Sequence, residues 1–253
     1  MADRTESEWH GRHAGKDAVR SEVWSALEQQ GAGRGRGWSH IPNFVGAEQA
    51  AERLATLPVW QEARVVKSNP DSPQRPVRLR ALQDGKHLYM AVPRLTTERC
   101  FVELIAEDLQ RRGIDLETAA TMQGALEHGR LVALDEMLPI DLVVTGCVAV
   151  SHDGGRTGKG AGFADLELGM LRQLHLIQPD TPIVTTVHAL QVVEDGRLPM
   201  LAHDSALTLI VTPDEVINVQ PIYPQPAGLR WEDVLPEQYQ TIPALRKLRE
   251  QLH

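Results

Sequence analysis

The hydrophobic residues of this chain recur with two different spacings, and each spacing predicts one kind of element. Apolar residues three and four positions apart are typical of helices that bury one face, whereas short continuous apolar runs are typical of strands covered on both faces. The first pattern predicts helices over residues 16–29, 46–57, 78–84, 98–111, 165–176 and 245–252. The second pattern predicts strands over residues 63–67, 87–92, 142–150, 182–187 and 207–212.

The order of these elements predicts the fold class. Strands that alternate with helices along a chain indicate an α/β fold with a mostly parallel sheet. A length of 253 residues suits one large α/β domain with appended segments. We expect the polar N-terminus, residues 1–14, to be flexible, residues 15–220 to form the α/β domain, and residues 221–253 to form a C-terminal extension that packs on it.

Composition narrows the class of protein. Hydrophobic residues make up 42% of the chain, enough for a sizeable core, and the net charge of −8 argues against nucleic acid or a membrane surface as the partner. The sequence shows no apolar run near the roughly 18 residues of a membrane span, and no signal peptide. Cys100 and Cys147 lie in apolar surroundings without metal-site spacing, which favours buried, reduced thiols in a cytoplasmic protein.

The glycine loop, residues 153–165, is the segment that says most about function. It has five glycines within nine residues and lies between the apolar run 142–150 and the helix predicted over 165–176, so its backbone can approach a ligand closely. Arg156 and Lys159 add cationic donors, and the helix start adds unpaired N–H groups; together these predict a phosphate site. An ordinary turn is the alternative, and the spacing matches neither the Walker nor the dinucleotide-binding sequence.

Acidic and histidine residues near the predicted helix starts and strand ends have two interpretations each. Asp165 and Glu167, at the start of a helix, either complement its dipole or hold Mg²⁺ beside phosphates. His188 follows a predicted strand and His203 precedes one, so each is either a proton-transfer group or a structural residue. The sequence contains no catalytic triad order and no metal-binding histidine pair, which disfavours nucleophilic and metal-dependent hydrolysis.

Residues 154–165 resemble, without a gap, the signature Gly-x-Arg-Leu-Gly-x-Gly-Lys-Gly-Tyr-Tyr-Asp of the 5-formyltetrahydrofolate cyclo-ligase (methenyltetrahydrofolate synthetase) family. Lys16 and Arg20 lie one helical turn apart. By themselves they are typical of a solvated surface pair, but they also resemble the N-terminal Lys/Arg helix of that family. The resemblance covers about residues 16–215 and includes the similar segments 91–94, 140–144, 203–204 and 210–213.

The chain departs from the family pattern on the folate side. Ala161 stands where the signature has lysine, and Ala164 where it has the second tyrosine. The Glu-x-x-Thr segment that helps the family to hold the pterin has no clear counterpart near residues 74–78. The sequence of residues 156–167 and 187–193 resembles the branch of methenyltetrahydrofolate synthetase domain-containing proteins more than the general family pattern.

The resemblance implies a fold and a reaction. The fold is a three-layer α/β/α sandwich with a Rossmann-like, mostly parallel sheet. The reaction is the ATP- and Mg²⁺-dependent conversion of 5-formyltetrahydrofolate to 5,10-methenyltetrahydrofolate, in which the formyl oxygen is phosphorylated, N10 attacks and phosphate leaves. Such a reaction needs cations and N–H groups around phosphate more than a covalent nucleophile.

The resemblance also implies a role for each candidate residue. Catalytic roles fall on Arg156 and Lys159. ATP would contact the cations, glycines and acid Lys16, Arg20, Gly155, Arg156, Gly158, Lys159, Gly160, Gly162 and Asp165. The implied ligands of Mg²⁺ are Asp165 and Glu167. The folate-like substrate would contact Phe163, His188 and His203.

Other functions remain open at this point. A non-catalytic nucleotide- or folate-binding regulatory protein of the same fold is favoured by the altered folate side, whereas the retained cations favour an enzyme. An isomerase acting on a phosphosugar is favoured only by fold analogy.

Overall fold

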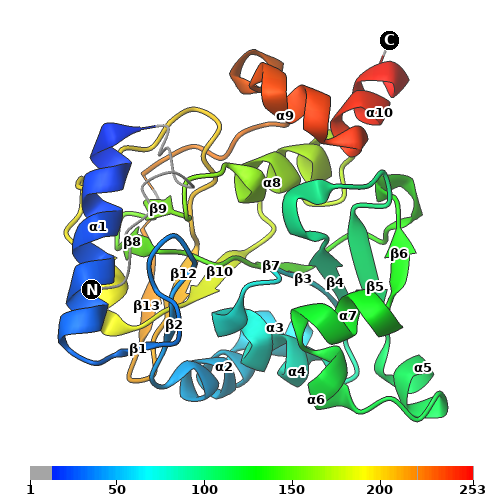
Figure 1. Ribbon diagram of the computed structural model, residues 1–253, viewed down its shortest axis with the longest axis horizontal. Coiled ribbons are helices and arrows are strands. Elements are labelled where there is room, and N and C mark those ends of the chain that lie inside the picture. Colours follow the sequence, from blue (N-terminus) through cyan, green and yellow to red (C-terminus); the bar gives the residue numbers. More distant parts are fainter. Residues whose placement is uncertain (1–12, 221, 253) are drawn as a thin grey trace.

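The computed structural model describes residues 13–220 and 222–252, which form a central sheet with helices on both sides (Figure 1). The helices are α1 (Ala14–Gln29), α2 (Ala47–Ala55), α3 (Pro58–Glu62), α4 (Arg75–Gln83), α5 (Ala106–Arg111), α6 (Leu116–Ala119), α7 (Met122–His128), α8 (Phe163–Gln173), α9 (Pro236–Thr241) and α10 (Pro243–Gln251). The strands are β1 (Gly33–Arg34), β2 (Asn43–Phe44), β3 (Val65–Ser68), β4 (His87–Ala91), β5 (Phe101–Leu104), β6 (Arg130–Val132), β7 (Leu142–Val144), β8 (Ala149–Ser151), β9 (Arg156–Thr157), β10 (Ile183–Thr186), β11 (Val192–Val193), β12 (Leu209–Val211) and β13 (Val216–Asn218). Short 3₁₀ turns are η2 (Ser72–Gln74), η3 (Pro93–Leu95), η4 (Leu134–Glu136), η5 (Ala189–Gln191) and η6 (Trp231–Asp233).

The main sheet has eight strands in the order β13-β12-β10-β7-β3-β4-β5-β6. The strands from β12 to β4 are parallel to their neighbours, whereas β13 on one side and β5 and β6 on the other pair antiparallel. The predicted α/β fold with a mostly parallel sheet is therefore confirmed. Parallel strands present their carboxyl ends at one edge of the sheet, which is where α/β folds bind ligands.

Successive residues of each strand point to opposite faces of the sheet and so build two apolar layers. Val143 of β7 belongs to one cluster with buried residues of α8 and α10, whereas Leu142 and Val144 belong to a second cluster with α2 and α4. Figure 1 shows α8 and α10 on one side of the sheet and α2, α3 and α4 on the other. The three-layer α/β/α arrangement is confirmed.

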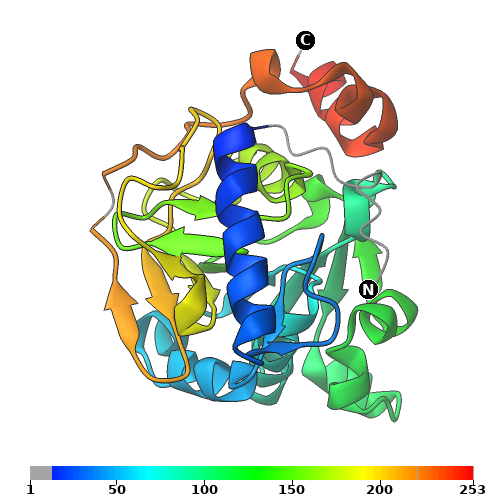
Figure 2. The ribbon, with the colours of Figure 1, turned by 60° about the vertical axis from the view of Figure 1, so that its left-hand side comes forward.

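A smaller sheet, in the order β11-β8-β9, carries the N-terminal helix. Val19, Val23 and Trp24 of α1 share an apolar cluster with Val148 and Ala149. Figure 2 shows α1 lying across these strands. Because β9 is part of the glycine loop, this packing brings α1 beside that loop.

The apolar run 142–150 is not one strand, as the pattern predicts, but two. β7 ends at Val144 in the main sheet, and β8 begins at Ala149 in the smaller one. Gly146 lies between them, where a Cβ would come within 2.7 Å of Gln74 Oε1. The chain therefore leaves the main sheet at a glycine whose surroundings leave little room for a side chain.

The predicted helix over residues 98–111 is wrong in its first half. Residues 101–104 form β5, which pairs antiparallel with β4, and only Ala106–Arg111 is helical. Phe101 and Val102 are of the aromatic and β-branched types that suit a pleated surface, and pairing with a neighbouring strand overrides their helical spacing.

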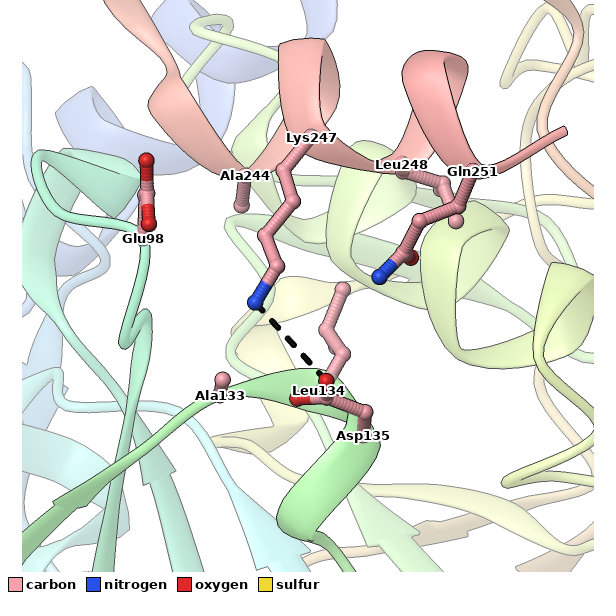
Figure 3. Close-up of a pocket in the computed structure, with 8 residues that line it drawn as sticks. All are labelled: Glu98, Ala133, Leu134, Asp135, Ala244, Lys247, Leu248 and Gln251. Carbon is pink, nitrogen blue, oxygen red and sulfur yellow. Dashed lines mark ion pairs between the residues drawn. The ribbon is translucent and has the colours of Figure 1, made fainter. Parts of the chain in front are cut away.

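The C-terminal helices pack on the same side of the sheet as α8. Leu245 and Leu248 of α10 are buried in the cluster that contains Val143. Figure 3 shows Lys247 of α10 directed towards Asp135, with 3.7 Å between Nζ and Oδ2, beside a pocket of only about 10 Å³. The domain boundaries stay predictions, and most of the N-terminus expected to be flexible lies outside the described residues. Over residues 13–220 and 222–252, no helix is both long enough and apolar enough to cross a bilayer.

Candidate functional site

A cleft of about 780 Å³ opens at the carboxyl ends of β3, β4 and β7. One wall is formed by the start of α1 and by the glycine loop with the first turns of α8. The segments that follow β3 and β4 line another part, and residues 228–238 close it from the C-terminal side. This position and size suit a small-molecule site of the kind that α/β folds carry.

The glycine loop forms the end of the cleft where the backbone is most open. Gly160 and Gly162 have φ of +103° and +74°, a conformation that glycine adopts without steric cost. Gly162 is the N-cap of α8, so the N–H groups of the first turn of that helix point out of its end at the cleft wall. The arrangement is the anion-binding geometry that the sequence predicts.

Lys16 and Arg20 line the cleft and are 7% and 4% exposed, so the alternative of a solvated surface pair is wrong. The ammonium group of Lys16 forms an ion pair with the carboxylate of Asp204. Arg20 donates from Nε to the carbonyl oxygen of Gly158 at 2.6 Å and pairs with Asp17. Burial lowers the pKa of Arg20, and the nearby carboxylates oppose that shift.

Arg156 is more deeply buried than the sequence suggests for a catalytic cation. It is 2% exposed, donates from Nε to the carbonyl oxygen of Ser205 at 2.7 Å, and forms an ion pair with Asp165. Burial opposes its charge, but Asp165 and other neighbours outweigh that effect and the pKa of Arg156 is raised. Arg156 therefore holds the start of α8 against the segment before β12. Part of its side chain also lines the cleft.

Lys159 is the most accessible cation of the glycine loop, with 40% of its side chain exposed. Its Nζ lies 3.1 Å from Oδ1 of Asp71, which follows β3 on the other side of the cleft. The pair is half-buried, because the side chain of Asp71 is only 14% exposed. Lys159 is nevertheless the cation of the glycine loop that a ligand in the cleft reaches most easily.

The two acids expected to hold Mg²⁺ both line the cleft, and each already has a cationic partner. Asp165 uses Oδ1 for Arg156 and for the N–H of Ser205, which donates to it at 3.0 Å. Glu167 Oε2 lies 2.5 Å from Nζ of Lys67, a lysine with no exposed surface.

The carboxylates of the cleft fit a Mg²⁺ ion that takes most of its ligands from phosphate and water. Across the described ranges, no group of three or more His, Cys, Asp or Glu residues is placed to hold a metal ion. Mg²⁺ in nucleotide sites commonly takes one or two protein carboxylates and completes its shell with phosphate oxygens and water. Asp165, 17% exposed and directed at the cleft, fits that mode better than the buried Glu167.

The structure brings most of the predicted site residues to this cleft but not all of them. Phe163 and His203 line it, whereas His188 and Gly155 do not. His188 lies beside η5, where its Nδ1 accepts a hydrogen bond from the N–H of Leu190 at 3.2 Å, and burial lowers its pKa. Gly155 lies in the turn between β8 and β9, where a Cβ would come within 2.5 Å of Ser151 Oγ. Both positions serve the local backbone.

Some cleft residues escape prediction from the sequence. Asn69 and Asp71 follow the buried strand β3, and polar residues directly after a buried strand are a usable signal for them. Arg94 lines the cleft after β4 with φ of +61°, an uncommon conformation for a residue with a Cβ. Residues 228–238 carry no signal of their own, because they are far from the motifs along the chain.

Comparisons with known proteins identify the family of the chain. The sequence profile of the 5-formyltetrahydrofolate cyclo-ligase family matches residues 12–213. The methenyltetrahydrofolate synthase domain-containing protein of Bos taurus is 39% identical over 238 residues, which are 93% of this chain and 62% of that protein. Its counterpart in Mus musculus is 40% identical over 237 residues, 93% of this chain and 63% of that protein. The chain thus spans less than two thirds of the length of these relatives.

A solved structure supports the fold independently. The 5,10-methenyltetrahydrofolate synthetase of Aquifex aeolicus, determined by NMR, aligns with a TM-score of 0.50 and 18% sequence identity. The alignment covers 86% of this chain and 97% of that one. The profile match over residues 12–213 shows that the chain belongs to the 5-formyltetrahydrofolate cyclo-ligase family.

Proposed function

We propose that this chain is an ATP- and Mg²⁺-dependent enzyme of the cyclo-ligase type, which converts 5-formyltetrahydrofolate or a closely related molecule to its ring-closed methenyl form. One observation carries the proposal. The buried Lys16 and Arg20 of α1, the more exposed Lys159 and the N-terminal end of α8 converge on one end of a cleft that is large enough for two ligands.

The charges at that end suit phosphate transfer. ATP bound with Mg²⁺ supplies the phosphoryl group that turns the formyl oxygen into a leaving group, and N10 of the folate then closes the ring. Lys159 would contact the transferred phosphate, because it is the more exposed of the two cations of the glycine loop and lines the cleft. The N–H groups at the start of α8 stabilise negative charge that develops there. Asp165 is the carboxylate best placed for the metal ion.

The folate substrate would bind its ring system beside Phe163, away from the cations. Ala161 and Ala164 flank Phe163 in the cleft lining and leave more room there than the lysine and tyrosine of the family signature would. A folate-like substrate is therefore compatible with this end, and a bulkier analogue is too. A cytoplasmic location is part of the proposal and is supported by the two free, buried cysteines Cys100 and Cys147.

A non-catalytic binding protein is the second candidate. The observation that favours it is that Lys16, Arg156 and Lys159 are each paired with a carboxylate of the chain itself, so the phosphate site is partly neutralised. Thermal unfolding with ADP, ATP and 5-formyltetrahydrofolate, each alone, tests binding, since a ligand of the native state must raise the melting temperature. Turnover in the same preparation separates the candidates. Binding of both ligands without methenyl formation favours the second candidate, and absence of any shift contradicts both.

A further inference from the structure

Residues 228–238, here called the strap, line the cleft although they lie beyond the residues 12–213 that match the family profile. The strap runs from the chain that follows β13, through η6, into the start of α9. It contributes the apolar side chains of Leu229, Val234 and Leu235 and the polar side chains of Arg230, Asp233 and Gln238. A segment outside the shared family region therefore completes the site of this chain.

Two glycines hold the strap close to α8. A Cβ at Gly169 would come within 2.9 Å of Leu229 Cδ1 and 3.2 Å of Leu229 Cα. A Cβ at Gly228 would come within 2.7 Å of Gln173 Oε1. The absence of side chains on both partners lets the strap backbone lie against the helix, so this wall of the cleft is a fitted part of the fold.

Hydrogen bonds fix the segment just before the strap as well. The buried Arg172 of α8 donates to Oε1 of Gln225 at 2.8 Å, and Gln225 Nε2 donates to the carbonyl oxygen of Ala206 at 2.9 Å. The strap thus enters the cleft from an anchored position.

The charged groups of the strap are satisfied among themselves and with the cleft wall. Arg230 Nε donates to Oδ2 of Asp233 at 2.8 Å, and His203 Nδ1 lies 3.0 Å from the same oxygen. His203 Nε2 lies 3.8 Å from Asp204, which pairs with Lys16. The hydrogen bond from Arg230 lowers the pKa of Asp233. This chain of polar contacts ends at Lys16, on the phosphate side of the cleft.

The strap also adds apolar side chains to the cleft lining that Phe163 shares. Leu229, Val234 and Phe163 are partly buried against the same apolar cluster under α8, and all three also line the cleft. Apolar walls with a few fixed polar groups are typical of sites for ring-shaped ligands. The strap and Phe163 thus form one side of the cleft, and the cations of the glycine loop form another.

We propose that the strap is the acceptor wall of the cleft: Leu229, Val234 and Leu235, with Phe163, select a flat and largely uncharged ring system such as a reduced pteridine, while phosphates bind at the glycine loop. This inference rests on the proposed function. It adds that the choice of acceptor is determined by residues that the family profile does not include.

The test compares two ligands on the same set of variants. Val234→Ala and Leu235→Ala, singly and together, remove apolar surface from the strap, and Ile222→Ala removes an exposed apolar side chain of the same extension that does not line the cleft. Binding of 5-formyltetrahydrofolate and of Mg·ADP is measured separately by calorimetry, with melting temperatures as the check on folding. We expect the double variant to weaken folate binding about tenfold, from the loss of a few methyl groups of contact, and to change ADP affinity less than about twofold. Ile222→Ala should match the parent for both ligands.

Three results overturn the inference in different ways. In the first, the parent binds folate with an affinity that neither single variant nor the double variant changes. In that case the strap is not the acceptor wall, although the proposed function stands. If ADP binding weakens as much as folate binding, the strap has no selective role. If the parent binds ADP but no folate, the proposed function fails in its substrate and the inference fails with it.

Discussion

Arg20 of α1 donates its Nε hydrogen to the carbonyl oxygen of Gly158 at 2.6 Å, across 138 positions of the chain. The bond joins the N-terminal helix to the glycine loop, so the two cationic segments that the sequence shows far apart act as one structural unit. Loss of the arginine would leave the carbonyl oxygen of Gly158 with only the longer hydrogen bond from Thr157 Oγ1, at 3.2 Å.

Replacement of Arg20 by alanine should therefore affect both stability and nucleotide binding. We expect a loss of about 1.5–3 kcal/mol in the free energy of unfolding, the range for a hydrogen bond that involves a charged group. ADP affinity should fall in the same variant because the glycine loop loses its anchor. Urea denaturation and calorimetry measure the two effects. Arg197→Ala, which removes an exposed pair with Glu22, is the matched control and should leave both nearly unchanged.

Two glycines of the same loop should respond differently to alanine. Gly158 faces open space in the described structure, whereas Gly160 has φ of +103°. We expect Gly158→Ala to keep the parent melting temperature but to weaken ADP binding, because the new methyl group lies where phosphate approaches. Gly160→Ala should lose about 1–2 kcal/mol of stability, the cost of a left-handed conformation for an L-residue. Parent-like ADP affinity in Gly158→Ala would contradict the assignment of Gly158 to ligand contact.

The pair of Lys67 and Glu167 tests whether Glu167 holds a metal ion or a lysine. Lys67 is fully buried, with Nζ 2.5 Å from Glu167 and 2.7 Å from Asn69 Oδ1. Glu167→Gln should cost about 3–5 kcal/mol of stability, because it leaves a buried ammonium group without its counter-ion. The double variant Lys67→Met with Glu167→Gln should recover much of that loss. If the double variant recovers both stability and Mg·ADP affinity, Glu167 is the counter-ion of Lys67. If the double variant still lacks Mg²⁺-dependent affinity, Glu167 is a ligand of the metal ion.

The cysteines should be inert in the native protein. Burial raises the pKa of Cys100 to about 12, and burial likewise raises the pKa of Cys147. A raised pKa keeps each thiol protonated as the pH increases from 7 to 9, and only the thiolate reacts with alkylating agents. Mass spectrometry after iodoacetamide treatment should show little labelling in buffer across this pH range and full labelling in denaturant. Rapid native labelling at pH 8 would contradict the burial of these residues.

The sequence predicts the parallel core well because its strands are covered on both faces and read as apolar runs. β4, β10 and β12 fall within the predicted ranges, β3 extends one residue beyond its range, and α8 begins within two residues of its predicted start. The edge of the sheet is harder to predict. β5 has a helical spacing of apolar residues and becomes a strand only because β4 and β6 pair with it.

The site, like the fold, has a part that the sequence predicts and a part that it does not. Lys16, Arg20 and the glycine loop are predictable because they lie in motifs, and the structure brings them together at one cleft. The partners that neutralise them are not predictable from spacing, since the pair of Lys16 with Asp204 depends on how two distant segments pack. His188 is a residue that the sequence predicts to contact the substrate but that does not line the cleft. It follows a parallel strand as a ligand-binding residue often does, yet its ring accepts a hydrogen bond from the turn of η5.

If the chain is a cyclo-ligase, phosphate release must be coupled to ring closure. Purified protein is incubated with Mg·ATP and 5-formyltetrahydrofolate, and methenyl absorbance and inorganic phosphate are followed together. The account predicts equal amounts of both products and the loss of both in Lys159→Ala, while Arg197→Ala keeps the parent rate. Phosphate without methenyl product, or neither product from a protein that binds both ligands, would contradict it.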